Sequence, residues 1–147
     1  MPSRNPDYEA KVRHIFSAAP FIQHLGIVLT SLGEGVCVAT LPVRPEHLQQ
    51  DGFIHAGVLA TLADHTAGAA AGSLVAADET ILSVEFKVNL LRPAVGETAL
   101  CRGSVLRHGR TLIVAEAEVF AVKDGVEKLV SKATVTLAVV SAAVGER

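Results

Sequence analysis

Hydrophobic and polar residues alternate through much of the chain after residue 80, which is typical of β-strands with one buried face. The alternation is clearest in ILSVEFKVNLL, residues 81–91. We expect one face of this strand to lie in the core and the other to be solvated. The expected core face carries Leu82, Val84, Phe86, Val88 and Leu90, and the solvated face carries Ser83, Glu85, Lys87 and Asn89.

Five other segments have strand patterns. Short sequences rich in Gly and Asp (GEG, HGR and KDGVE) separate several of them and favour hairpin turns. Because hairpins join neighbouring antiparallel strands, we expect a mostly antiparallel sheet. The predicted strands are residues 26–32, 35–43, 98–107, 111–122 and 128–140.

Two segments have helical patterns. Asn5, Pro6 and Asp7 form a helix start, with Asn as the cap, and predict a short helix over residues 6–18. The segment from His55 to Val75 is apolar on all sides, so a helix there must be buried. It would be about 30 Å long. Small residues along it would let a sheet approach closely: Ala60, Ala63, Ala67, Gly68 and Ala71.

The order of elements is a helix, two strands, a long helix and four strands. A curved antiparallel sheet wrapped around the one long buried helix satisfies both the hairpins and the apolar helix. We therefore predict a single domain over residues 1–147 with an α+β fold similar to the hotdog fold. No internal repeat, low-complexity tract or linker interrupts the chain.

The composition of the chain indicates an interface between subunits. Half of the residues are hydrophobic and only 19% are charged, which suggests a buried subunit interface in addition to the core. The net charge of −2 provides no basic field for nucleic acid or anionic lipid. Two cysteines, neither in a CxxC pair, are too few for a disulfide framework or a structural zinc site.

Localisation follows from the remaining segments. The first residues, MPSRNPDYEAKVRHIF, lack the apolar core of a signal peptide, so we expect a cytoplasmic protein. Residues 56–77 are long and apolar, but Asp64 and His65 near their middle favour a buried helix of a water-soluble protein over a membrane span.

Asp64 is the first candidate for chemistry, because a carboxylate in an apolar helix is costly unless it is paired or used. Two interpretations stay open from the residues alone. Asp64 could be a catalytic group, since buried titratable groups often are. It could equally bond a neighbouring backbone group.

The start of the same helix is the second candidate. His55, Ala56 and Gly57 lie where a helix has free N–H groups, which can polarise a carbonyl oxygen or simply be capped. His55 and Asp64 are nine residues apart, so they lie about half a turn out of phase and about 13 Å apart along the axis. One straight helix cannot bring both to one small site. Two subunits could, which predicts a site shared across a dimer.

Other chemistries find little support. His47, His55, Asp64 and His65 have no known ligand spacing, so we expect no metal site. No GxSxG, GxGxxG or P-loop motif is present. Gln49 precedes the helix, where its amide could hold a water molecule or substrate, or lie in a solvated loop.

The sequence HAGVLATLAD resembles the HGG-x6-D signature of hotdog-fold acyl-CoA thioesterases of the phenylacetate-pathway (PaaI-like) type. The flanking sequence agrees, with Gln49 six residues before the His. The segments LSVEFKVNLLRPA, GET and RHGRTLIVAEAEV also match the family pattern. The resemblance covers about residues 20–140.

The resemblance implies a role for each matching residue. Asp64 would be the general base or nucleophile, and Gln49 would position water or substrate. The N–H of Ala56, where the family usually has Gly, would donate to the thioester oxygen. The residues on either side of it, His55 and Gly57, would contact the substrate. Ser83 would assist the acid, although the alternation places it on the solvated face. Gly109 and Arg110 would lie near coenzyme A.

The resulting hypothesis is an acyl-CoA thioesterase that releases a carboxylic acid and coenzyme A. It implies no metal or redox cofactor, because coenzyme A is part of the substrate. It also implies a homodimer that shares its active sites and, from the family, a homotetramer of either helix-inward or helix-outward arrangement. Two rivals remain: a hotdog hydratase or dehydratase, whose Asp-x-Asn-x-x-His arrangement is missing here, and a non-catalytic acyl-CoA-binding protein.

Overall fold

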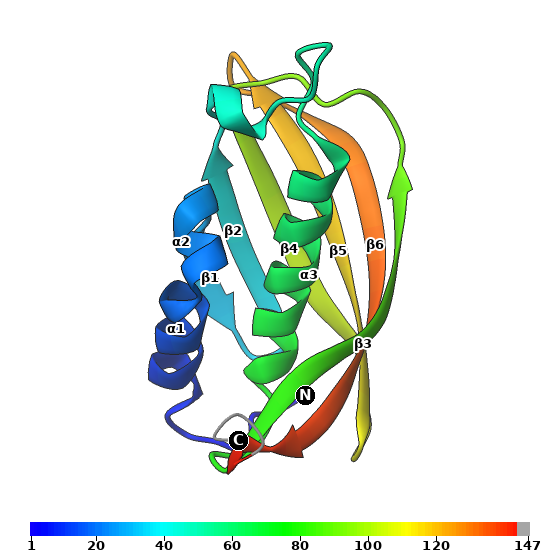
Figure 1. Cartoon of the computed structure of the whole chain (residues 1–147). Helices are drawn as coiled ribbons and strands as arrows, with labels where there is room; N and C mark the ends of the chain where they lie inside the picture. Colours follow the sequence, from blue (N-terminus) through cyan, green and yellow to red (C-terminus); the bar gives the residue numbers. More distant parts are fainter. Residues whose placement is uncertain (144–147) are drawn as a thin grey trace.

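The computed structural model describes residues 1–143, which form a curved six-stranded sheet around one long helix (Figure 1). All strand pairs are antiparallel, in the order β1-β2-β4-β5-β6-β3. The predicted α+β architecture is therefore confirmed. The elements are α1 (Tyr8–Ala18), α2 (Pro20–Leu25), β1 (Val28–Gly33), β2 (Val36–Pro42), a 3-10 helix (Pro45–His47), α3 (Ala56–Gly72), β3 (Glu79–Leu90), β4 (Thr98–His108), β5 (Leu112–Lys123) and β6 (Val126–Ser141).

The long helix α3 lies in the concave face of the sheet, with α1 and α2 beside it at the β1 edge (Figure 1). Its small residues Ala63, Ala67 and Ala71 are fully buried, as predicted. The sheet approaches so closely that a Cβ at Gly103 of β4 would lie 3.0 Å from the carbonyl oxygen of Thr66. No helix within residues 1–143 is long and apolar enough to span a membrane.

Two helix boundaries differ from the prediction. α1 begins at Tyr8, and its cap is Asp7 rather than Asn5. Asn5 instead accepts a hydrogen bond from the Asp7 N–H at 3.0 Å and orders the residues before the helix. α3 ends at Gly72, three residues before the predicted Val75, because Ser73 caps it by donating its hydroxyl to the Ala70 carbonyl.

A β-bulge in β3 overturns the predicted alternation. Ser83 pairs with Leu137 of β6 and Glu85 pairs with Thr136, so Val84 between them has no partner residue. A bulge inserts one residue and shifts the alternation by one position. Before the bulge Ser83 faces α3, because its partner Leu137 is fully buried and lies beside Gly68 of that helix.

The predicted core face of β3 is consequently wrong in two ways. Leu82 and Val84 are 52% and 61% exposed instead of buried. Phe86, beyond the bulge, does lie on the helix side, opposite the buried Val135. It is nevertheless 48% exposed, because β3 is an edge strand of the sheet (Figure 1).

Candidate active site

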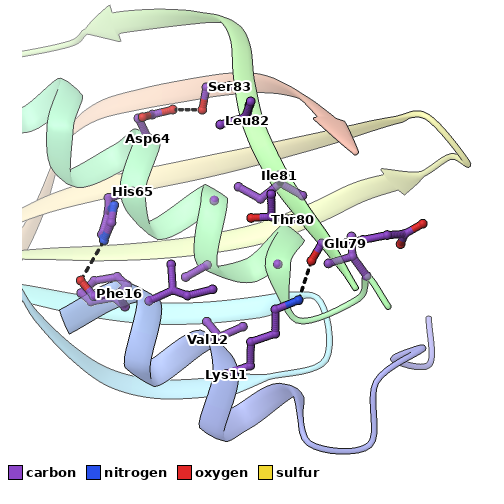
Figure 2. A pocket seen from close by; sticks show the side chains of 15 residues that line it. Lys11, Val12, Phe16, Asp64, His65, Glu79, Thr80, Ile81, Leu82 and Ser83 are labelled. Carbon is purple, nitrogen blue, oxygen red and sulfur yellow. Dashed lines mark hydrogen bonds between the residues drawn. The ribbon is translucent and has the colours of Figure 1, made fainter. Parts of the chain in front are cut away.

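Asp64 and Ser83 form a hydrogen-bonded pair between the middle of α3 and β3. The Ser83 hydroxyl donates to Oδ1 of Asp64 over 2.7 Å (Figure 2). The expectation that Ser83 points away from the helix is therefore wrong, and the bulge at Val84 is the reason. The bond occupies one carboxylate oxygen and restricts the rotation of the Asp64 side chain. The second oxygen, Oδ2, remains available to accept a proton or to attack.

The Asp64–Ser83 pair lies at a groove of about 350 Å³ between α1, α3 and β3. Apolar side chains and glycines form most of its surface. The groove is lined by Lys11, Val12, Ile15, Phe16, Asp64, His65, Gly68, Ala69, Gly72, Val75, Glu79, Thr80, Ile81, Leu82 and Ser83. A carboxylate beside an apolar groove of this size has the composition of a small-molecule site.

His65 connects two walls of this groove. Its Nε2 lies 3.2 Å from the carbonyl oxygen of Phe16, which can only accept, so Nε2 carries the proton. The rings of His65 and Phe16 lie 4.3 Å apart, centroid to centroid. Burial lowers the pKa of His65 below its ordinary value, so the ring is neutral near pH 7. His65 therefore acts as a neutral tether that holds α1 against α3 (Figure 2).

Sequence reasoning missed the contribution of α1 to the site. The helix itself was predicted, and the structure shows that Val12 and Phe16 form its buried side. No local signal indicates what a buried side packs against, because that depends on contacts between distant segments.

At the start of α3, one backbone N–H is capped by a side chain and another is available to a ligand. Nδ1 of His55 accepts the N–H of Gly57 over 2.8 Å, so His55 is the cap. Within residues 1–143, the N–H of Ala56 has no hydrogen-bond partner, and His55, Ala56 and Gly57 are all exposed. Ala56 can thus present its N–H to a ligand.

The loop before α3 orients Gln49. Its side-chain oxygen Oε1 accepts the N–H of Asp51 and, over 3.4 Å, the N–H of Phe53. The oxygen end of the amide is therefore committed to the loop. The nitrogen end is the part of Gln49 that can donate to a substrate carbonyl or to a water molecule.

The predicted site residues do not all come together within one protomer. Of the residues described, only Asp64 and Ser83 among the candidates line the groove, while Gln49, His55, Ala56 and Gly57 lie at the far end of α3. Eight residues of helix place Ala56 about 12 Å from Asp64 along the axis. The sequence predicted the corresponding separation of His55 from Asp64.

Gly109 and Arg110 form the turn between β4 and β5, outside the groove lining. The Gly109 N–H donates to the Leu112 carbonyl over 2.9 Å, and Arg110 is exposed. Their role toward coenzyme A stays a prediction.

A metal site finds no candidate ligands in the part of the chain that the structure describes, where no three His, Cys, Asp or Glu residues cluster. His47 is fully buried, and both ring nitrogens are engaged. Nδ1 accepts from the N–H of Arg44, and Nε2 lies 2.9 Å from the carbonyl oxygen of Leu25.

Comparison with known proteins decides the family. The sequence profile of the thioesterase superfamily matches residues 51–128, which include α3, β3, β4 and β5. The chain belongs to the thioesterase superfamily. The matched region contains both Asp64 and Ser83, so the pair at the groove lies within the part of the chain that matches the superfamily.

Individual relatives agree with this assignment. A thioesterase family protein from Silicibacter pomeroyi is 40% identical, with a TM-score of 0.89 over 91% of this chain and 98% of that one. A 1,4-dihydroxy-2-naphthoyl-CoA hydrolase of Listeria monocytogenes is 28% identical over 78% of this chain and 91% of its own. The PaaI protein of the E. coli phenylacetic acid degradation operon shares the fold, with a TM-score of 0.82 at 21% identity over 95% and 97% of the two chains. The predicted thioesterase family and hotdog fold are confirmed.

Proposed function

We propose that this protein is a thioesterase that hydrolyses acyl-CoA to a carboxylic acid and coenzyme A. The observation that carries the proposal is the carboxylate of Asp64, held by Ser83 at 2.7 Å beside an apolar groove. An apolar groove suits an acyl group, and a carboxylate at the groove suits activation of water. The reaction requires no metal or redox cofactor, because a carboxylate and hydrogen-bond donors suffice for thioester hydrolysis.

Each residue has a role in the proposed reaction. Oδ2 of Asp64 takes a proton from water, whose oxygen attacks the thioester carbon, or attacks that carbon itself. The Ala56 N–H, supported by the helix dipole, donates to the carbonyl oxygen as it gains negative charge. The amide nitrogen of Gln49 donates to the same oxygen or holds the water. The carbon–sulfur bond then breaks, and the thiolate of coenzyme A takes up a proton. Where Asp64 itself attacked, water then cleaves the acyl–Asp64 anhydride, which releases the carboxylic acid and restores the carboxylate.

The proposed site needs two copies of the chain. Within one protomer Ala56 lies about 12 Å along the helix from Asp64, too far for both to contact one carbonyl group. We infer that Ala56 and Gln49 of one protomer complete the site of Asp64 in its partner. Two-fold symmetry would then generate two identical sites in each dimer.

The exposed edge of β3 supports this dimer. In the described residues one side of β3 pairs with β6, and the other side has no strand beside it. Four of its hydrophobic side chains are about half exposed or more: Leu82 at 52%, Val84 at 61%, Phe86 at 48% and Leu90 at 55%. A long apolar edge is a template for pairing with another strand. We propose that two β3 edges meet in the dimer.

The activity test is hydrolysis of a panel of acyl-CoA thioesters, followed by release of the free thiol. We expect Asp64→Ala to lower kcat by about 10²-fold or more, the usual contribution of a general base. Asp78→Ala, which removes an exposed acid outside the groove, is the matched control. Wild-type turnover by a folded, dimeric Asp64→Ala protein would contradict the proposal.

The shared site has its own test. Asp64→Ala and Ala56→Pro protomers, each expected to have about 1% or less of wild-type kcat as a homodimer, are mixed in equal amounts and allowed to exchange subunits. Half of the dimers are then mixed and contain one intact site, so about one quarter of wild-type activity should return. If each site were instead made by a single protomer, both sites of a mixed dimer would carry a defect, and no activity would return on mixing.

A further inference from the structure

The groove beyond the Asp64–Ser83 pair is built within one protomer and has two apolar walls. Val12 and Phe16 of α1 are buried on one side, and Ile81 of β3 lies on the other. The floor is the face of α3 that carries Gly68, Ala69 and Gly72. Ile15 at the rim is 48% exposed, so the groove opens to the surface there.

The two floor glycines are not required by the packing of the protomer. A Cβ at Gly72 would lie 3.6 Å from Cγ2 of Val12, and a Cβ at Gly68 would lie 3.5 Å from Cδ1 of Ile81. Both are ordinary van der Waals contacts, in contrast to the 3.0 Å approach at Gly103. Gly68 lies inside α3, where glycine lowers stability relative to alanine, and Gly72 is the last residue of the helix. Because neither position carries a side chain, the floor of the groove reaches the helix backbone at Gly68 and at Gly72.

The length of the groove can be compared with that of a hydrocarbon chain. Eight residues of helix separate Asp64 from Gly72, a distance of about 12 Å. A zigzag chain of tetrahedral carbons joined by bonds of about 1.5 Å advances about 1.25 Å per bond, so about ten bonds span this distance. The groove volume of about 350 Å³ is ample for such a chain.

The end of the groove away from Asp64 is closed by a polar contact. The ammonium group of Lys11 donates to the carbonyl oxygens of Ala76 at 3.1 Å and Ala77 at 3.0 Å, and also to that of Glu79. All three protons of the ammonium group are thus committed, and α1 is tied to the turn between α3 and β3 (Figure 2). A longer apolar chain would have to break these bonds or turn out into solvent.

We propose that the groove binds a linear aliphatic acyl chain of about eight to ten carbons, and that Val12 and Gly72 determine its maximum length. The proposal rests on the proposed thioesterase function and adds the substrate class to it. The same protomer supplies Asp64 and the acyl groove. Chain-length selection is then a property of how α1 packs on α3.

The test measures kcat/KM for straight-chain acyl-CoA thioesters from two to sixteen carbons, together with benzoyl-CoA and phenylacetyl-CoA. Each methylene buried in the groove should raise kcat/KM about fourfold, equivalent to about 0.8 kcal/mol, up to a maximum near eight to ten carbons. Gly72→Leu fills the distal part of the groove and displaces about three methylenes. The ratio of kcat/KM for decanoyl-CoA to that for butyryl-CoA should therefore fall about 60-fold.

Two further variants control the interpretation. Val12→Ala enlarges the groove and should move the optimum to a longer chain, opposite in sign to Gly72→Leu. Ala10→Leu adds three carbons, against four for Gly72→Leu, at an exposed position of α1 outside the groove and should leave the ratio unchanged. If Gly72→Leu fails to fold, Gly72→Ala, whose Cβ fits at 3.6 Å, should lower the ratio by about fourfold.

Failure of this proposal can be distinguished from failure of the proposed function. Thiol release that depends on Asp64, with no dependence on chain length or with an aryl thioester preferred, would overturn the groove assignment and leave the thioesterase intact. If no thioester is hydrolysed, the melting temperature serves as the readout. Decanoyl-CoA should then raise the melting temperature of the wild type more than that of Gly72→Leu, and equal shifts would refute the assignment.

Discussion

Replacing Ala56 by proline removes one proposed oxyanion donor and almost nothing else. Ala56 is the first residue of α3, the helical position at which proline is best tolerated. The preceding residue, His55, has φ −61° and ψ 138°, which is the conformation that a residue before proline prefers. The N–H that disappears has no partner within residues 1–143, so no hydrogen bond of the protomer is lost.

The expected effects on stability and on activity therefore have opposite signs. Proline at a compatible position stabilises a protein by about 0.4–1 kcal/mol, because it restricts the unfolded chain. For a protein of this size the melting temperature should rise by about 1–4 °C. Loss of one oxyanion donor costs about 10²–10³-fold in kcat, or about 2.7–4 kcal/mol.

The assay combines thermal unfolding with steady-state thioester hydrolysis on the same preparations. Ala56→Gly is the matched variant, because it keeps the N–H and restores the glycine usual in the family; it should retain activity while losing stability at the helix start. A folded, dimeric Ala56→Pro protein with wild-type kcat would refute the assignment of this N–H as a donor. A fall in melting temperature would show instead that the substitution disturbs α3.

Three other predictions concern stability and reactivity. Gly103→Ala brings a Cβ to 3.0 Å from the Thr66 carbonyl oxygen. The free energy of unfolding should therefore fall by about 1–3 kcal/mol and the melting temperature by about 3–10 °C. An unchanged melting temperature would contradict the close approach. Burial raises the pKa of Cys37 and Cys101 to about 12, so native protein should react negligibly with a thiol reagent at about pH 8, and unfolded protein should react at both thiols. Burial lowers the pKa of His65, so the unfolded chain binds a proton there more readily, and the stability that depends on neutral His65 is lost as pH falls below about 6.5. His65→Gln should weaken this decline of melting temperature between about pH 7 and pH 5, and an identical decline would assign it to other groups.

The strand β3 illustrates the limit of reading faces from alternation. Its existence and approximate bounds could be predicted, because the period of two is a local property of the sequence. The bulge at Val84 could not, because it depends on the pairing of β3 with β6. One unpaired residue turned Ser83 from the solvated face toward Asp64 and exposed Leu82, so a correct strand was assigned the wrong faces.

In the candidate site, too, local features could be predicted and contacts between distant segments could not. Asp64 was identified from its own helix, because a carboxylate among apolar residues is conspicuous in any window of sequence. The acyl groove was not, because its wall α1 is about fifty residues away in the chain and meets α3 only through packing and the His65–Phe16 bond.

The sequence by itself determined most of the elements, the antiparallel sheet around α3, the position of Asp64 in that helix and its separation from His55. These follow from periodicity, turn chemistry and helix geometry, which act over a few residues. Only the tertiary structure decided that Ser83 contacts Asp64, that the oxygen of the Gln49 amide is committed to its loop, and that α1 and α3 enclose a groove. Those outcomes depend on strand register and on packing between segments far apart in the chain, and register and packing are set by the folded core as a whole.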